Sequence, residues 1–171
     1  MKKREDVRTR FMEDVFRHQG IIHKIARLYF DDPTEREDVF QDILLNAWRS
    51  YDSFAGASAF STWLYKVALN TALFRLRARR VARRKLDALP EAGTSVVSTE
   101  ARDDAVLGLR SAIGVLDDLE KSVILLHLEA KSYREIAEIT GLTEGHVGVK
   151  LNRIKQKLKA RMAPQEESDG D

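Results

Sequence analysis

The sequence predicts an all-α protein made of two small helical domains joined by a flexible linker, the C-terminal one with a helix-turn-helix. Apolar residues recur at helical spacing along nearly the whole chain, and strand signals are almost absent. Its three prolines, Pro33, Pro90 and Pro164, fall where helices can begin or end. Residues 87–103 contain Pro, Gly and small polar residues, a composition typical of a tether.

These observations divide the chain into a first domain over residues 1–86, a linker over 87–104, a helix-turn-helix domain over 105–163 and an acidic tail over 164–171. A chain of 171 residues is long enough to form two small domains. Hydrophobic residues make up 43% of the chain, enough for a core in each domain.

Three helices are predicted in the first domain. The first covers about 9–30, where the apolar positions include Phe11, Val15, Ile22, Ile25 and Ala26. The second follows Pro33, opens with Thr34 and Glu37 as a capping box and ends near Arg49. A loop with Gly, Ser and Ala precedes the third helix, which runs from about Ser61 to Arg84.

Further helices are expected between about 104 and 162, the last two forming the helix-turn-helix. Its markers are Ala137, where two helices cross closely, Gly141, where the turn needs a left-handed backbone, and Val147, which packs the second helix on the first. Such a pair presents its second helix to the DNA major groove, and the cations between 150 and 161 suit phosphates. From the spacing alone, an ordinary helical hairpin remains an alternative interpretation.

Composition narrows the possible functions. The chain has no cysteine, which excludes disulfides, thiolate zinc sites and cysteine nucleophiles. No apolar run is long enough for a membrane span and no signal peptide is visible, so we expect a cytoplasmic protein without membrane insertion. The four histidines are scattered, and we expect no metal, no cofactor and no catalytic residue. Net charge is only +2, but acidic and basic stretches are segregated, which favours separate surfaces for a basic partner and for nucleic acid.

The predicted second helix has an acidic side opposite its apolar one. On this side lie Asp38, Gln41, Asp42 and Leu45, with Trp48 at the edge. An acidic surface that includes an apolar Leu and Trp favours docking of a basic partner helix. The alternative is a nuclease in which Asp38 and Asp42 bind metal, but no further ligand or base lies at helical spacing.

The predicted third helix combines cations, an amide and aromatics. Lys66, Asn70 and Arg77 share one stripe, which Trp63 and Phe74 border. This combination suits melted DNA, because unpaired bases stack on rings. We expect Phe74 in the core, and leave Trp63 open between core and DNA. Seven cations between 75 and 85 come without an acid, so we expect a polyanion to face them.

The motifs also resemble a known family. Glu37-Asp-Val-Phe-Gln-Asp, Asp52-Ser-Phe and Phe60-Ser-Thr-Trp-Leu-Tyr-Lys-Val-Ala-Leu-Asn resemble the promoter-melting domain of bacterial RNA polymerase sigma factors. The stretch from Ser132 to Val147 resembles their C-terminal helix-turn-helix. The short linker and the absence of other domains resemble the extracytoplasmic-function (ECF) class.

This resemblance implies an alternative sigma factor that directs promoter-specific initiation. The residues implied to bind polymerase are Asp38, Gln41, Asp42, Leu45 and Trp48. Those implied for the −10 element are Phe54, Ala59, Phe60, Trp63, Lys66, Asn70 and Arg77. Those implied for the −35 element are Thr143, Glu144, His146, Lys150, Asn152, Arg153 and Lys157, the last expected to contact phosphate only. The implied partners are core RNA polymerase (clamp and flap), promoter DNA and an anti-sigma factor. A free-standing helix-turn-helix regulator and a nucleic-acid enzyme remain alternatives.

The sequence departs from the family's usual residues in three places. Gly148 and Val149 stand where Lys or Arg and then Ser are common, and His146 stands where Thr is common. In the third helix, Leu73 and Phe74 replace a common Asp. We expect these differences to alter the −35 sequence that is read and to leave the fold unchanged.

Overall fold

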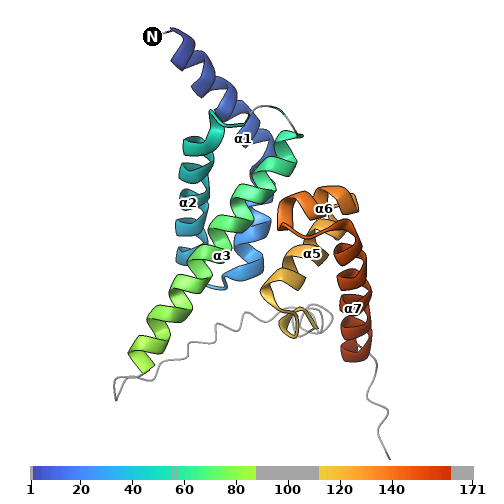
Figure 1. The fold of residues 1–171 in the computed structure, drawn as a ribbon. Helices are drawn as coiled ribbons and strands as arrows, with labels where there is room; N and C mark the ends of the chain where they lie inside the picture. The colour runs from blue at the N-terminus through green and yellow to red at the C-terminus, as the bar shows by residue number, and fades with distance from the viewer. Residues whose placement is uncertain (1, 55, 57, 88–111, 163–171) are drawn as a thin grey trace, which may run out of the picture. The chain divides into compact units, whose positions relative to one another are not determined.

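The computed structural model describes residues 2–54, 56, 58–87 and 112–162, and these form helices without a strand (Figure 1). The chain separates into two compact units, residues 1–98 and 99–171. The predicted all-α, two-domain fold is thereby confirmed. The linker from 88 onward and the tail over 164–171 lie outside the described residues. None of the described helices is long and apolar enough to cross a membrane.

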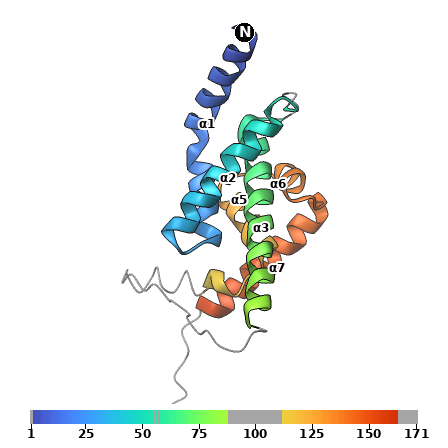
Figure 2. The same cartoon turned by 90° about the vertical axis from the view of Figure 1, so that its left-hand side faces the viewer.

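The first unit is a bundle of α1 (Lys2–Tyr29), α2 (Pro33–Tyr51) and α3 (Phe60–Asp87), each packed on the other two (Figures 1 and 2). Every helix turns one apolar side inward, and the sides meet in one core. Fully buried residues include Ile22, Ile25, Phe30, Val39, Ile43, Leu64, Ala68 and Ala72. The helix α1 begins well before the predicted residue 9, since charged residues with good helix propensity extend it toward the N-terminus.

The start of α2 differs from the expected Thr34–Glu37 capping box. Asp32 is the N-cap, and its carboxylate accepts a hydrogen bond from the Glu35 backbone N–H at 2.9 Å. Pro33 occupies the first turn, where its missing N–H and restricted φ cost nothing. Thr34 therefore lies inside the helix, because an Asp before Pro starts the helix two residues earlier than a Thr cap would.

The second unit contains α5 (Asp118–Leu128), α6 (Tyr133–Thr140) and α7 (Glu144–Met162), again packed pairwise. Complete capping boxes, Asp117 with Glu120 and Ser132 with Glu135, start α5 and α6. Gly141 ends α6 at φ +77°, and its N–H donates to the Ala137 carbonyl at 2.9 Å. The left-handed turn expected at Gly141 is therefore confirmed, with Val147, Leu151 and Ile154 buried in the core as expected.

Candidate protein and nucleic-acid interfaces

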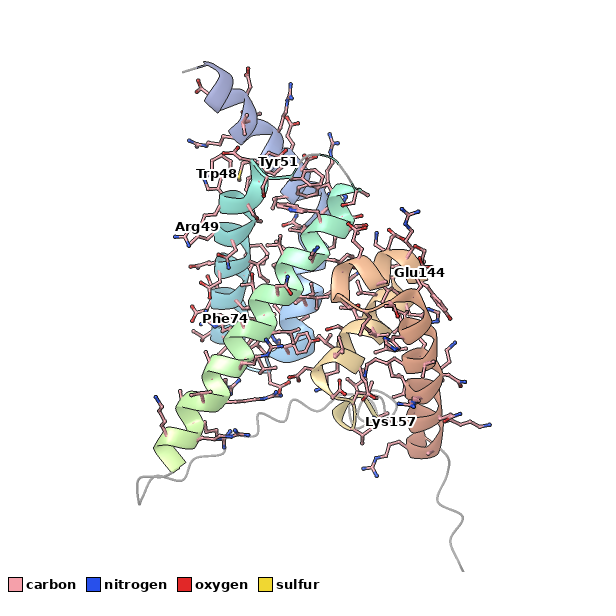
Figure 3. The ribbon with its side chains drawn as sticks, viewed as in Figure 1. Trp48, Arg49, Tyr51, Phe74, Glu144 and Lys157 are labelled. Atoms are coloured by element: carbon pink, nitrogen blue, oxygen red, sulfur yellow. The ribbon has the colours of Figure 1, made fainter. Side chains whose placement is uncertain are left out.

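The exposed side of α2 carries the predicted partner-binding residues, which we call the docking face: Asp38, Gln41, Asp42, Leu45 and Trp48. Val39, Ile43 and Ala47 on the other side are fully buried, so the helix is amphipathic as expected. Leu45 and Trp48 remain 46% and 39% exposed, with Trp48 labelled in Figure 3. The docking face therefore presents two sizeable apolar side chains next to two carboxylates.

Those two carboxylates have an internal partner that the sequence analysis did not foresee. The Arg75 guanidinium of α3 donates through Nη2 to Asp38 at 2.7 Å and through Nη1 to Asp42. One turn further along α3, Arg79 Nη1 donates to Glu35 at 2.7 Å. The expectation that the whole basic run needs an external polyanion is corrected: two of its cations face α2 carboxylates, because α2 and α3 pack side by side.

An apolar groove adjoins the docking face between α1 and α2. It has a volume of about 730 Å³, and its lining includes Met12 and Phe16 of α1 with Leu45 and Trp48 of α2. Phe16 is 73% exposed. The apolar pattern of the first helix identified core positions and did not reveal this contribution. The signal was the pair Met12 and Phe16, one turn apart and outside the stripe of Phe11, Val15 and Ile22.

Aromatic side chains around the loop between α2 and α3 form a cluster. Phe54, Phe60 and Trp63 lie with ring centroids 5.1 to 5.8 Å apart, and Tyr51 lies 6.1 to 6.3 Å from each. The structure thus brings together three of the residues predicted for the −10 element. Tyr51, labelled in Figure 3, had not been singled out.

Tyr51 links this cluster to α1. Its hydroxyl donates to Asp14 Oδ2 at 3.2 Å. Burial raises the pKa of the Tyr51 phenol above its usual value, and the hydrogen bond to Asp14 and that carboxylate's charge act in the same direction. The phenol is therefore protonated near neutral pH and acts as a fixed donor that anchors the cluster.

The other predicted −10 residues lie at the start of α3 and along it. The Ala59 carbonyl accepts from the Thr62 and Trp63 backbone N–H groups at 3.0 and 3.1 Å, so Ala59 is held at the helix start. Lys66, Asn70 and Arg77 are exposed, and Trp63 is half-buried at the aromatic cluster.

Phe74 does not lie in the core. Its side chain is 74% exposed on α3 (Figure 3). The core side of this part of the helix is taken by Ala68, Ala72 and Leu76 instead. Phe74 follows Asn70 by one turn, which places it on the exposed side. Our expectation gave too much weight to its hydrophobicity and too little to helical phase.

In the second unit, α7 presents an exposed side that begins at the turn. Thr143, Glu144, His146, Asn152 and Arg153 are exposed and Lys150 is partly so. The His146 backbone N–H donates to Thr143 Oγ1 at 3.3 Å, which satisfies one free N–H at the helix start. Glu144, labelled in Figure 3, adds a carboxylate there. Polar groups of several kinds are thus displayed on one helix that buries Val147, Leu151 and Ile154.

Lys157 has an internal acceptor. Its ammonium donates to Glu120 Oε1 at 2.7 Å and Oε2 at 2.9 Å, and Glu120 is only 5% exposed. Contact between Lys157, labelled in Figure 3, and a phosphate would have to compete with this ion pair, which was not anticipated from the sequence. In the part of the chain described here, no group of three or more His, Cys, Asp or Glu residues is placed to hold a metal.

Comparison with protein families gives two matches in the expected order. Residues 15–82 match the family described as Sigma-70 region 2, and residues 107–158 match Sigma-70, region 4. Among curated proteins, the ECF RNA polymerase sigma-E factor of Haemophilus influenzae is 32% identical over 140 residues, or 74% of each chain. The protein of the same name from Escherichia coli is 31% identical over 157 residues, covering 83% of this chain and 82% of its own.

Two solved structures are also similar. The sigma factor RpoE of Bartonella quintana, crystallised with the anti-sigma factor NepR, superposes with a TM-score of 0.73 at 20% identity, over 91% of this chain and 98% of its own. CnrH, in complex with the cytosolic domain of CnrY, has a TM-score of 0.63 at 28% identity, over 88% of this chain and 85% of its own. The first likeness is one of fold alone.

Proposed function

This chain belongs to the ECF class of RNA polymerase sigma factors, and on that premise we propose how its surfaces divide the work of initiation. Its function is that of an alternative sigma factor that directs promoter-specific transcription initiation. We propose that it binds core polymerase and promoter DNA and helps to open the DNA in the cytoplasm, and that it catalyses no reaction itself. The observation that carries the proposal is one chain with an amphipathic acidic face in one unit and a helix-turn-helix in the other.

Core polymerase binds at the docking face. The polymerase surface that meets this face carries cations that pair with Asp38 and Asp42. It also carries an apolar side chain that packs on Leu45 and Trp48 and enters the adjoining groove. The mixture of exposed apolar area and flanking charge supports this role, because apolar contact gives affinity while charge gives orientation and association rate. Arg75 lowers the net negative charge of the free docking face, so a basic partner helix has to displace it or share the two carboxylates with it.

The aromatic cluster and the exposed side of α3 bind the −10 element. Phe54, Phe60 and Trp63 supply ring surfaces, and Ala59 holds the helix start beside them. Asn70 offers a donor and an acceptor to the edge of an extruded base, while Lys66 and Arg77 neutralise the backbone. A base that leaves the stack would thus meet a ring and an amide on neighbouring elements.

The exposed side of α7 reads the −35 element. His146, Lys150, Asn152 and Arg153 are the readers, with Thr143 and Glu144 at the helix start. Arg or Lys pairs best with guanine and Asn with adenine, so this set can discriminate bases in the major groove. Lys157 is paired with Glu120, so it can contact a phosphate only by giving up that ion pair.

An anti-sigma factor is a further proposed partner. Two structurally similar sigma factors were solved with NepR and with the cytosolic domain of CnrY. The groove of about 730 Å³ between α1 and α2 can accept apolar side chains of such a protein. Because this groove adjoins the docking face, an occupant would exclude core polymerase.

Run-off transcription from a genomic promoter library tests the function. Core polymerase with this chain should initiate at a defined promoter set that core alone ignores. The chain alone should bind those duplexes weakly, whereas a free-standing regulator would bind them equally well without polymerase. Tight binding without polymerase, together with no stimulation of core enzyme, would overturn the proposal.

A further inference from the structure

Phe74 belongs to a continuous exposed stripe along α3. Counted at 100° per residue, the members fall within about 80° of arc. They are Lys66, Asn70, Phe74, Arg77, Val81 and Arg84, which we call the α3 stripe. All six are exposed, Phe74 at 74% and Val81 at 52%. The stripe therefore alternates cationic or amide side chains with two apolar ones.

The surroundings of Phe74 favour a polyanion over an apolar protein partner. From residue 60 to 86, α3 has no acidic residue, and its stripe carries three cations. Arg75, whose charge is paired with Asp38 and Asp42, points to α2 and is outside the stripe. An apolar protein surface would have to bury Arg77 and Lys66 without a partner, at a high desolvation cost. A polyanion removes that cost.

An aromatic ring among cations suits one part of a polyanion in particular. A ring stacks on an unpaired base, while neighbouring cations contact the backbone on either side. A paired base within a duplex does not expose its face. Asn70, which we propose meets an extruded base, precedes Phe74 by one turn of the same stripe, so a second base would reach Phe74 along the strand.

We propose that the Phe74 ring is an additional stacking platform for an unpaired base of the melted promoter. It extends the −10 interface beyond Asn70 and stabilises the open state specifically. This inference rests on the proposed function, since it needs a promoter strand at α3. It assigns a role to a residue that the predicted −10 set omitted.

The test uses holoenzyme assembled with core polymerase and two versions of one promoter, a full duplex kept closed by low temperature and a fragment with unpaired bases over the −10 region. The variants are Phe74→Ala, Phe74→Leu and Phe74→Trp, compared at one salt concentration because affinity depends on it. Leu128→Ala is the matched control, since Leu128 is also 74% exposed but lies on α5 in the other unit.

We expect Phe74→Ala and Phe74→Leu to weaken binding of the unpaired fragment roughly 5- to 100-fold, the usual range for one base–ring stack. Duplex binding should change less than about twofold by comparison, because that state offers no base face. Phe74→Trp should retain parental affinity, and Leu128→Ala should match the parent on both fragments.

Four results would overturn the inference. The first is unchanged binding of the unpaired fragment by Phe74→Ala, and the second is parental binding of that fragment by Phe74→Leu. The third is an equal loss of binding by Phe74→Ala on both fragments, and the fourth is a loss of its affinity for core polymerase. The second would mean a simple apolar contact, the third a duplex contact and the fourth a polymerase contact. If parental holoenzyme itself prefers neither promoter fragment over unrelated DNA, the proposed function fails and this inference falls with it.

Discussion

Glu120 of α5 and Lys157 of α7 form an ion pair in which the Lys157 ammonium lies 2.7 and 2.9 Å from the two carboxylate oxygens. The same carboxylate accepts the Asp117 backbone N–H at 3.0 Å, which completes the capping box of α5. One nearly buried carboxylate thus starts one helix and anchors another. The ion pair thereby joins the start of α5 to the C-terminal half of α7.

Lys157→Met should destabilise the protein by about 1–2 kcal/mol, because it leaves the Glu120 carboxylate nearly buried without its cation. The estimate lies below that for a fully buried pair, since the Lys157 side chain is itself 46% exposed. Thermal unfolding of the full chain measures the difference. The control is Lys159→Met, an exposed position, which should change stability by less than about 0.5 kcal/mol. Equal unfolding temperatures for the two variants would contradict a structural role for Lys157.

Asp38→Lys should weaken holoenzyme formation strongly, because it places a cation against the basic partner surface and releases Arg75 as well. The loss should reach several kcal/mol at a closely packed interface. Titration of core polymerase with labelled protein measures it. Glu138→Lys makes the same change of charge on α6 and should leave core affinity near that of the parent. Normal affinity of Asp38→Lys would disprove the docking assignment.

Arg75→Gln should act in the opposite direction. Removing the guanidinium leaves Asp38 and Asp42 with their full negative charge, so association with core polymerase should become several-fold faster at low salt and more sensitive to salt. Stopped-flow association at two ionic strengths gives both quantities. Slower association than the parent would mean that Arg75 holds the carboxylates in their binding geometry, and the competition we propose would then be wrong.

Asn70→Ala should spare assembly and impair promoter opening. Losing an amide that pairs with a base edge should cost about 1–3 kcal/mol of discrimination. The rate of open-complex formation on matched and mismatched −10 sequences is the measurement. A variant that opens both sequences as the parent does would exclude Asn70 from base capture, whereas reduced core affinity would point to a polymerase contact.

Arg153→Ala should change the preferred −35 sequence, whereas Lys159→Ala should weaken binding to all sequences alike. We propose Arg153 as one of the readers, and we expect Lys159, which lies further along α7, to contact phosphate only. A randomised −35 library transcribed by each holoenzyme separates preference from strength. Lys159→Ala should also lower the salt slope by about one unit. If both variants keep the parental −35 sequence preference, the division into base-reading and phosphate-contacting residues is wrong.

Gly148→Ala should stabilise the protein by roughly 0.5–1 kcal/mol, because alanine restricts the unfolded chain and favours helix. A Cβ at Gly148 would lie 3.5 Å from Tyr133 Cε2, an ordinary contact. Gly141→Ala is the contrasting variant and should destabilise, since Gly141 has φ +77°. Chemical denaturation of both proteins measures the two signs. A destabilised Gly148→Ala would mean that the contact with Tyr133 is too tight.

The helices and the turn followed from local physics that the sequence alone expresses. Apolar spacing at 3.6 residues placed Val39, Ile43 and Val147 inward, and only glycine adopts the Gly141 conformation cheaply. The same periodicity marked the acidic side of α2 as exposed. These properties depend on a residue and its neighbours within a few turns, which is why motif and pattern were sufficient for the fold class and for the family.

Tertiary structure alone decided which charges meet between helices. Arg75 and Asp38 are 37 residues apart in the chain, as are Lys157 and Glu120. Helical periodicity assigns each residue to a side of its own helix, but an ion pair depends on the relative position and rotation of two packed helices. Phe74 is a different case: its hydrophobicity suggested burial, but its helical phase, which it shares with Asn70, already placed it on the exposed side of α3. Local sequence determines each helix face, and packing between helices determines what that face meets.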